Sequence, residues 1–238
     1  MRKGSSEAGM SLVEVTIILM VLAILTSVLA PSIADYVNEA RSAKAKEDVE
    51  ALGTGIMRLL RDVALPFPVR TAGASPSRAS TNRVDLLVSE GNIPVASAGT
   101  AVPADAVGYL VQAGVGWDSA IAAGVELATD HLVTNGNAYS VVSFPSGGGP
   151  RAGLGWRGGY ISTSTGPDPW GNRYGCTTVW LGPGSDVTLA ANKGTNNDTF
   201  CLTAGADGVA ETRMYSSADG AVTVQGDDVL YVFQGNTR

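Results

Sequence analysis

The sequence predicts an α+β fold in which a long N-terminal helix, half membrane-inserted and half amphipathic, packs on a C-terminal antiparallel sheet. Three observations predict it. An uncharged run rich in Ile, Leu and Val fills residues 15–34, and a charged segment with helical periodicity follows it. Apolar and polar residues alternate in the last part of the chain, between Gly, Asp and Asn turns. Glycine is frequent, at 30 residues, and only 16% of residues are charged, which favours strands and loops over a helical bundle.

Length and charge limit the classes of protein. The chain has 238 residues, enough for one compact domain with an extra element, or for two small domains. Its net charge of −6 argues against a general nucleic-acid role, because phosphate binding needs a clustered basic face. The acidic balance suits solubility outside the membrane and leaves room for a divalent cation.

The N-terminal run is long enough to cross the hydrocarbon core of a membrane. Arg2 and Lys3 precede it, which favours a cytoplasmic N-terminus and an exported C-terminal domain. A secretory signal would have an apolar core of only about 7–15 residues and then a small-residue cleavage site. Because helical character continues past the run, we expect the segment to be retained.

Glu14 lies at the edge of this run, where a carboxylate is costly unless it is paired. Two interpretations remain open at this point. The acid can lie at the level of the lipid headgroups and mark the membrane boundary, or it can await a partner in an assembled state.

The helix is predicted to continue from Ser11 to about Asp62, a length of about 78 Å at about 1.5 Å per residue. Pro31 should bend or locally open it. Gly53 and Gly55 weaken the helix, and we expect them to let a sheet approach closely. An apolar stripe at spacings of three and four supports the second half, and it consists of Val49, Leu52, Ile56, Leu59 and Val63.

The middle of the chain carries weaker signals. Residues 66–80 read as a loop, and residues 85–91 and 119–132 are predicted to be short helices. His131, the one histidine, has no second His or nearby Cys for a zinc site, so we expect a structural histidine with satisfied hydrogen bonds. The chain has no GK[ST] phosphate loop and no GxSxG elbow, so no catalytic set is predicted.

Four strands are expected in the C-terminal part, at residues 176–181, 199–203, 221–225 and 229–233. Cys176 and Cys201 are the only cysteines, and their spacing does not suit a zinc knuckle or a CxxC pair. In an oxidising compartment a disulfide between them would contribute about 3 kcal/mol, and two buried thiols are the alternative.

Residues 9–15, Gly-Met-Ser-Leu-Val-Glu-Val, resemble the processing site of type IV prepilins. In that family cleavage follows a glycine, glutamate is fifth in the mature chain, and a proline corresponding to Pro31 is 22nd; Met10 replaces the usual phenylalanine. The resemblance implies that a prepilin peptidase cuts between Gly9 and Met10 and that the new amine is methylated. Glu14 of one subunit would then pair with the Met10 amine of a neighbour, and this head-to-tail contact would generate a helical filament.

Residues 155–161 and 168–174 resemble the major pseudopilin of type II secretion systems, which carries a similar Asp-Pro-Trp-Gly-Asn turn. Gly159 and Arg173 replace prolines that are frequent in that family. We interpret the turn as structural, with Gly171 and Asn172 at positive-φ positions and Trp170 and Tyr174 anchoring it to the sheet. The turn comprises Asp168, Pro169, Trp170, Gly171 and Asn172.

The same family has a calcium-binding loop near its C-terminus. Residues 205–208, Gly-Ala-Asp-Gly, and residues 226–228, Gly-Asp-Asp, match its outline with a longer spacing. The resemblance therefore implies a calcium site. Calcium takes about six to eight oxygen ligands, of which carboxylates commonly supply a few. Its ligands would be Asp207, Asp227 and Asp228, with Asp219 in reserve. Ordinary Asp-Gly turns between strands are the alternative.

The resemblance divides the chain into a leader, residues 1–9, a transmembrane and filament-core helix, 10–34, and the amphipathic half of the helix, 35–65. A variable insertion, 66–154, and a C-terminal sheet, 155–238, follow. Its fold would be the pilin fold. The subunit would cross the inner membrane once, and after assembly it would belong to a periplasmic or cell-surface filament. An assembly ATPase, an inner-membrane platform protein and minor pilins or pseudopilins would be its partners.

Three functions are therefore weighed. The first is the major pseudopilin of a type II secretion pseudopilus, which the turn and the acidic loop favour. The second is a type IV pilin of a surface fibre for adhesion, motility or DNA uptake, which the chain length and the cysteine pair favour. The third is a membrane-tethered enzyme or binding protein that uses the helix only as an anchor.

Overall fold

The computed structural model describes residues 10–70, 84, 86–92, 94–96, 125–139, 141, 154–162, 166–178, 181, 198–212, 222 and 224–234. Gly9 and Asp219, and the parts of the predicted elements at 119–124, 221 and 223, lie outside these residues. The chain divides into two compact units, residues 1–41 and residues 42–238.

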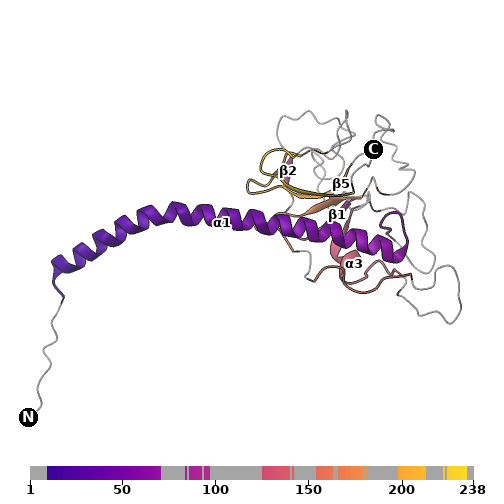
Figure 1. Cartoon of the computed structure of the whole chain (residues 1–238), viewed down its shortest axis with the longest axis horizontal. Helices are drawn as coiled ribbons and strands as arrows, with labels where there is room; N and C mark the ends of the chain where they lie inside the picture. The colour runs from indigo at the N-terminus through magenta and orange to yellow at the C-terminus, as the bar shows by residue number, and fades with distance from the viewer. Residues whose placement is uncertain are drawn as a thin grey trace, which may run out of the picture. The chain divides into compact units, whose positions relative to one another are not determined.

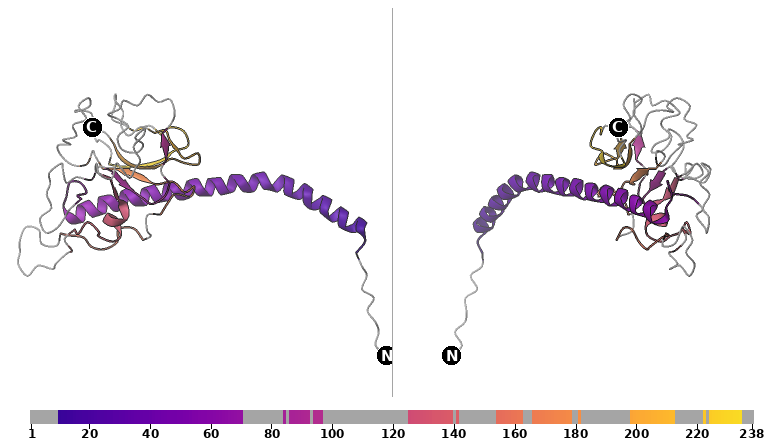
Figure 2. Two further views of the ribbon diagram at one scale, coloured as in Figure 1. Left: turned by 180° about the vertical axis from the view of Figure 1, so that it is seen from behind. Right: turned by 45° about the vertical axis from the view of Figure 1, so that its right-hand side comes forward.

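The first unit consists of the N-terminal part of helix α1, which spans Leu12–Val63 (Figure 1). These bounds confirm the predicted helix to within one residue at each end. Its most apolar window of 18 residues has a mean hydropathy of 2.6, and none of that window is buried. Pro31 lies inside the helix without ending it, and α1 is curved over its N-terminal half (Figure 2).

The second unit contains a five-stranded sheet and the last turns of α1. The strands are β1 (Leu86–Val88), β3 (Val125–Leu127), β4 (Gly175–Thr177), β5 (Thr199–Thr203) and β7 (Val229–Gln234). Their order in the sheet is β3-β1-β4-β5-β7. A second sheet pairs β2 (Val95–Ala96) with β6 (Val209–Ala210), and the short helix α3 spans Ala128–Leu132.

The five-stranded sheet is mixed, whereas an antiparallel sheet was predicted. β1 pairs with β3 in parallel, and the other three pairings are antiparallel. The parallel pair comes from residues 66–154, for which the sequence predicted no strands. The chain therefore forms an α+β fold with a mixed sheet.

Two of the predicted helices are wrong in the same way. Residues 86–88, within the predicted helix 85–91, form β1, and residues 125–127, within the predicted helix 119–132, form β3. Only residues 128–132 of the second prediction are helical, as α3. In the predicted strand 221–225, the described residues 222, 224 and 225 are not in a strand. By contrast, β5 has the predicted bounds.

The core lies between the last turns of α1 and one face of the sheet (Figures 1 and 2). Four of the five residues of the predicted stripe are buried there, with Val49, Ile56 and Leu59 fully inaccessible to solvent, and Val63 is partly buried. Leu87 of β1 packs in the same cluster. Leu86 and Val88 point to the other face, where they join Phe200 and Leu202 of β5. All three side chains of β1 are buried because both faces of the sheet are covered.

Gly53 allows α1 to approach β7, as predicted. A Cβ atom at this position would lie 2.8 Å from Cδ1 of Phe233 and 3.0 Å from Cδ1 of Tyr231. Gly55 fills the same role against Ile161, whose Cγ2 would be 3.1 Å from an added Cβ. The two glycines weaken the helix by about 1 kcal/mol each relative to alanine, and close packing offsets that cost.

The cysteines form the predicted disulfide. Cys176 of β4 lies directly opposite Cys201 of β5, and their sulfur atoms are bonded at 2.00 Å. Both residues belong to the cluster that packs on α1. The bond cross-links the neighbouring strands β4 and β5 and closes a covalent loop between two cysteines that are 25 positions apart.

Candidate functional site

The start of α1 is the first candidate site. Met10 and Ser11 precede the helix, and Met10 is 65% exposed. Ser11 acts as the N-cap, because its Oγ accepts the backbone N–H of Glu14 at 3.2 Å. Glu14 is exposed in the first turn, where a carboxylate is favoured by the helix dipole. The Ser-x-x-Glu spacing of residues 11–14 is that of a capping box, a signal of the helix start that is already present in the sequence.

Beyond Glu14, the described residues of the first unit expose a continuous apolar surface. Every residue from Met10 to Lys44 is exposed, and the run from Val15 to Ala34 carries no charge. Three hydroxyls within it bond to the preceding turn: Thr16 to Val13 O, Thr26 to Leu22 O and Ser27 to Ile24 O, each at 2.8 Å. These side chains are thus satisfied internally, and the segment can lie in lipid or among other helices.

The second candidate site is the turn at residues 168–172. Asp168 is 4% exposed, and its Oδ1 accepts the backbone N–H groups of Trp170 at 2.9 Å and Asn172 at 2.7 Å. Gly171 has a φ of 94°, as predicted. Asn172 does not have a positive φ, because it forms a bridge with Asn92 instead. Gly171 therefore supplies the positive φ of the turn, and Asn172 pairs with Asn92 through a β-bridge.

The two aromatic residues of the turn motif differ in their role. Tyr174 is 3% exposed, lies in the core against α1, and donates its hydroxyl to Oδ2 of Asp48 at 2.9 Å. Burial and the neighbouring Asp48 carboxylate raise the pKa of Tyr174 above its ordinary value. Trp170 is half-buried, and its Nε1 has no hydrogen-bond partner among the described residues. Tyr174 thus anchors the motif, and it does so on the helix as well as on the sheet.

The third candidate site is the acidic loop pair, residues 205–208 and 226–228, which the fold brings together. Oδ2 of Asp227 accepts the N–H of Ala206 at 2.6 Å and that of Asp207 at 3.2 Å. Asp207 and Asp227 are both exposed. Two of the predicted calcium ligands therefore lie on adjoining loops, although they are 20 positions apart in the sequence.

Asp228 faces a different segment. Its Oδ2 accepts the N–H groups of Glu211 at 3.0 Å and Thr212 at 2.6 Å. It is 6% exposed, and among the described residues its Oδ1 has no partner. Burial raises the pKa of Asp228, against the effect of the hydrogen bonds from Thr212 and Glu211. A buried carboxylate oxygen without a donor is one that a cation can satisfy.

Glu211 is a candidate ligand that the sequence did not single out. A Cβ atom added to Gly226 would lie 1.3 Å from its Oε2, so this carboxylate lies directly against the second loop. Within the described ranges, no three His, Cys, Asp or Glu side chains form a group that could hold a metal ion. The carboxylates instead divide into the pair Asp207 and Asp227, joined through Asp227 and the Asp207 amide, and the pair Glu211 and Asp228, joined through Asp228 and the Glu211 amide.

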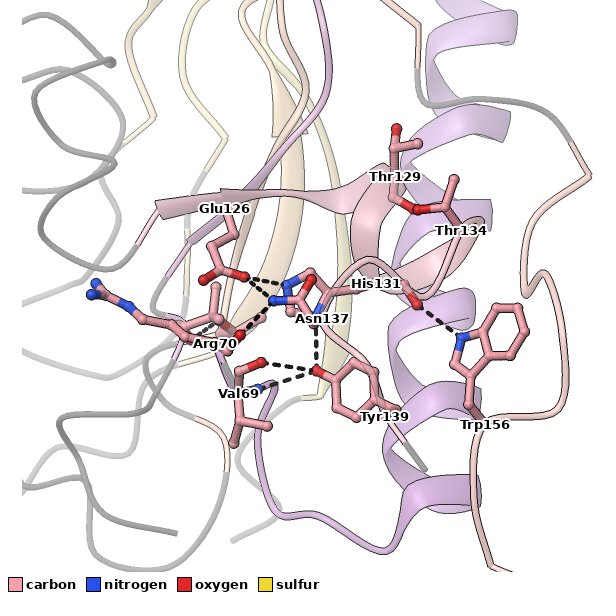
Figure 3. Close-up of polar contacts among 11 residues, drawn as sticks. Val69, Arg70, Glu126, Thr129, His131, Thr134, Asn137, Tyr139 and Trp156 are labelled. Atoms are coloured by element: carbon pink, nitrogen blue, oxygen red, sulfur yellow. Dashed lines mark hydrogen bonds and ion pairs between the residues drawn. The ribbon is translucent and has the colours of Figure 1, made fainter. Parts of the chain in front are cut away.

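A fourth cluster surrounds His131, which is fully buried (Figure 3). Its Nε2 lies 2.8 Å from Oε2 of Glu126, and its Nδ1 lies 2.7 Å from the hydroxyl of Tyr139. Since an ionised carboxylate only accepts, Nε2 carries the proton in the contact with Glu126, and Nδ1 shares a hydrogen bond with the Tyr139 hydroxyl. The prediction of a structural histidine with satisfied hydrogen bonds is confirmed.

The partners of His131 connect it to the segment after α1. The N–H of Val69 donates to the Tyr139 hydroxyl at 3.2 Å, and Nδ2 of Asn137 donates to Glu126 and to O of Arg70 (Figure 3). Burial by itself would raise the pKa of Glu126, but the hydrogen bonds and charge at His131 bring it below the ordinary value. The cluster fastens residues 126–139 to residues 69–70.

No protein-family model, curated protein or solved structure matches this chain. The sites above therefore rest on the geometry of this chain and on the motifs in its sequence. The residues that the structure describes form an α+β fold, and among them one helix, at the N-terminus, is long and apolar enough to span a membrane.

Proposed function

We propose that this chain is a structural subunit of a type IV pilin-like filament with a pilin fold, and that it is the major pseudopilin of a type II secretion pseudopilus. One observation carries the proposal. The part of α1 in the first unit contains an apolar window with a mean hydropathy of 2.6 and no buried residue, and Glu14 lies in the first turn of the helix, at the edge of the uncharged run 15–34. An apolar surface of this extent needs lipid or other helices around it.

Both environments follow from the proposed life of the subunit. Before assembly, the segment crosses the inner membrane once, and a prepilin peptidase removes the residues up to Gly9. An assembly ATPase and an inner-membrane platform protein then extract the subunit. In the filament, neighbouring helices replace lipid, and Glu14 pairs with the Met10 amine of the next subunit, which sets the register. Minor pseudopilins would start the filament.

A type IV pilin of a surface fibre is the second candidate, and the Cys176–Cys201 disulfide favours it. That bond resembles the C-terminal disulfide loop of pilins, and it stabilises a domain that acts outside the cell. The turn at residues 168–172 and the acidic loop pair favour the pseudopilus.

A deletion strain separates these two functions, with the proteins of the culture medium and the surface filaments compared between the strain and its parent. Lost secretion with surface fibres intact supports the pseudopilus. Lost fibres with unchanged secretion supports the surface pilin. Loss of a tethered enzyme or binding protein would leave secretion and surface fibres unchanged. The mass of that mature protein would correspond to a chain that still begins at Met1, with no cut after Gly9.

We also propose that the acidic loop pair binds calcium, with Asp207, Asp227 and Asp228 as ligands and Glu211 beside them. The buried oxygen of Asp228 without a donor supports this proposal. We predict that calcium raises the melting temperature of the full chain in detergent and that chelation reverses the shift. Magnesium, which demands a smaller octahedral site, serves as the control. No shift with calcium, in the parent and in Asp207→Ala alike, would remove the metal from the proposal.

A further inference from the structure

The turn at residues 168–172 contacts the loop that follows β5 through two side chains. The hydroxyl of Thr203 donates to Oδ2 of Asp168, and Nδ2 of Asn172 donates to O of Gly205 at 3.2 Å. The other oxygen of Asp168 accepts two backbone amides of its own turn, so the carboxylate is held from both sides. The turn therefore presents fixed polar groups to the end of β5.

Gly205, which accepts the hydrogen bond from Asn172, is the first residue of the acidic loop pair and packs against Asp227. It is buried, has a φ of 67°, and lies so close to Asp227 that an added Cβ would be 2.4 Å from the Asp227 carbonyl oxygen. The next two amides, of Ala206 and Asp207, donate to the Asp227 carboxylate. A shift of Gly205 would therefore move both acids relative to each other.

The opposite side of the turn is fixed independently of these acids. The N–H of Asn92 donates to O of Gly171 at 2.8 Å, and the N–H of Arg173 donates to O of Asn92 at 2.9 Å. Nε of Arg173 also donates to O of Gly91 at 2.8 Å. These contacts hold the turn beside the segment that follows β1, and they use the backbone of Asn92, whose side chain is exposed.

We propose that Asn172 and Asp168 are positioning residues for the acidic loop pair. The turn is held on one side by residues 91–92, and on the other side it fixes Gly205 and, through it, Asp207 and Asp227. This inference rests on the proposed calcium site for its functional reading. It gives the Asp-Pro-Trp-Gly-Asn turn a purpose beyond closing a bend, since the turn joins two motifs that are separate in the sequence.

The test compares the full chain in detergent with the variants Asn172→Ala and Asn92→Ala, which are matched because the two asparagines form a bridge with each other. Calcium alone is titrated by calorimetry, and amide hydrogen exchange of residues 205–208 is followed without metal. For Asn172→Ala we expect calcium affinity to fall by about 10–100-fold, the usual effect of losing an outer-shell partner. We also expect faster exchange of the Ala206 and Asp207 amides, whereas Asn92→Ala should behave like the parent.

A second pair of variants guards against a general loss of structure. Thr203→Val removes the hydroxyl that contacts Asp168 and should weaken calcium binding. Thr203→Ser keeps this hydroxyl and should bind calcium with the affinity of the parent. Equal affinity and equal exchange in the parent, Asn172→Ala and Thr203→Val would overturn the inference. If the parent binds no calcium, the calcium proposal fails, and the metal-free exchange of residues 205–208 still decides whether the turn positions the loops.

Discussion

Glu126 accepts hydrogen bonds from two side chains, those of His131 and Asn137, and both donors lie later in the chain. It is a half-buried carboxylate whose desolvation is more than offset by these partners, so its pKa is lowered in the folded protein. The sequence predicted that the hydrogen bonds of His131 are satisfied, but it did not indicate that Glu126 and Tyr139 are the partners. Hydrogen bonds between side chains 5 and 11 positions apart depend on the turn between them, which the sequence pattern did not define.

This carboxylate predicts a pH dependence. A lowered pKa in the folded state means that ionised Glu126 stabilises the fold above its ordinary value of 4.5, and that this contribution is lost as the pH falls through the folded value. We therefore expect Glu126→Gln to melt at a lower temperature than the parent near pH 7, and the difference to shrink as the pH falls below 4.5. The measurement is the melting temperature of each protein against pH.

Glu39→Gln is the matched control, because Glu39 is exposed on α1 and accepts no hydrogen bond that the structure records among the described residues. Its melting temperature should follow the parent at every pH. A constant difference between the parent and Glu126→Gln down to pH 3 would contradict the assignment of the stabilising charge to Glu126.

At the scale of the elements, α1 and β7 approach each other across Gly53. We predict that Gly53→Val destabilises the second unit by about 1–3 kcal/mol, because the added methyl groups would overlap the rings of Phe233 and Tyr231. Chemical denaturation of the full chain in detergent measures this change. Ala51→Val, on an exposed position of the same helix, should cost only its helix propensity, about 0.6 kcal/mol. Equal effects of the two substitutions would contradict the close approach.

The elements also show how far the sequence could predict the fold. α1 was predictable because its apolar run and its stripe extend over many turns, and β5 because turn residues flank it. β1 was not, because Leu86, Leu87 and Val88 are all buried and a short apolar run has no period that separates a strand from a helix. The parallel pairing of β1 with β3 depends on a crossover, and nothing local in the sequence specifies it.

In the candidate sites too, features with a local sequence signal could be predicted, and contacts between distant segments could not. The turn, the disulfide and the acidic residues were predictable because each is a short motif or a rare residue pair. The contact of Asn172 with Gly205 and the position of Glu211 beside Gly226 were not, since they join segments that only the folded sheet brings together. Asn172 was assigned a positive φ for the same reason, because its partner Asn92 lies far away in the sequence.

At the scale of the whole molecule, Glu14 is the acid that precedes the uncharged run of α1, residues 15–34. In a filament core it would be costly without a partner, and the amine created at Met10 of a neighbour is the proposed partner. Before assembly, the Ser11 cap leaves Met10 outside the helix, so the proposed cleavage point precedes its first turn. Processing and assembly should therefore respond differently to the loss of this carboxylate.

We predict that Glu14→Ala is still cut after Gly9 but fails to form filaments. Mass spectrometry of the purified subunit measures the cut, and electron microscopy of overproducing cells measures assembly. Glu39→Ala removes an acid from the same helix outside the apolar run, and it should be both processed and assembled. Normal filaments from Glu14→Ala would contradict the pairing with Met10, because the register would then depend on apolar contacts alone. A chain that is uncut in both variants and in the parent would instead contradict the filament function itself.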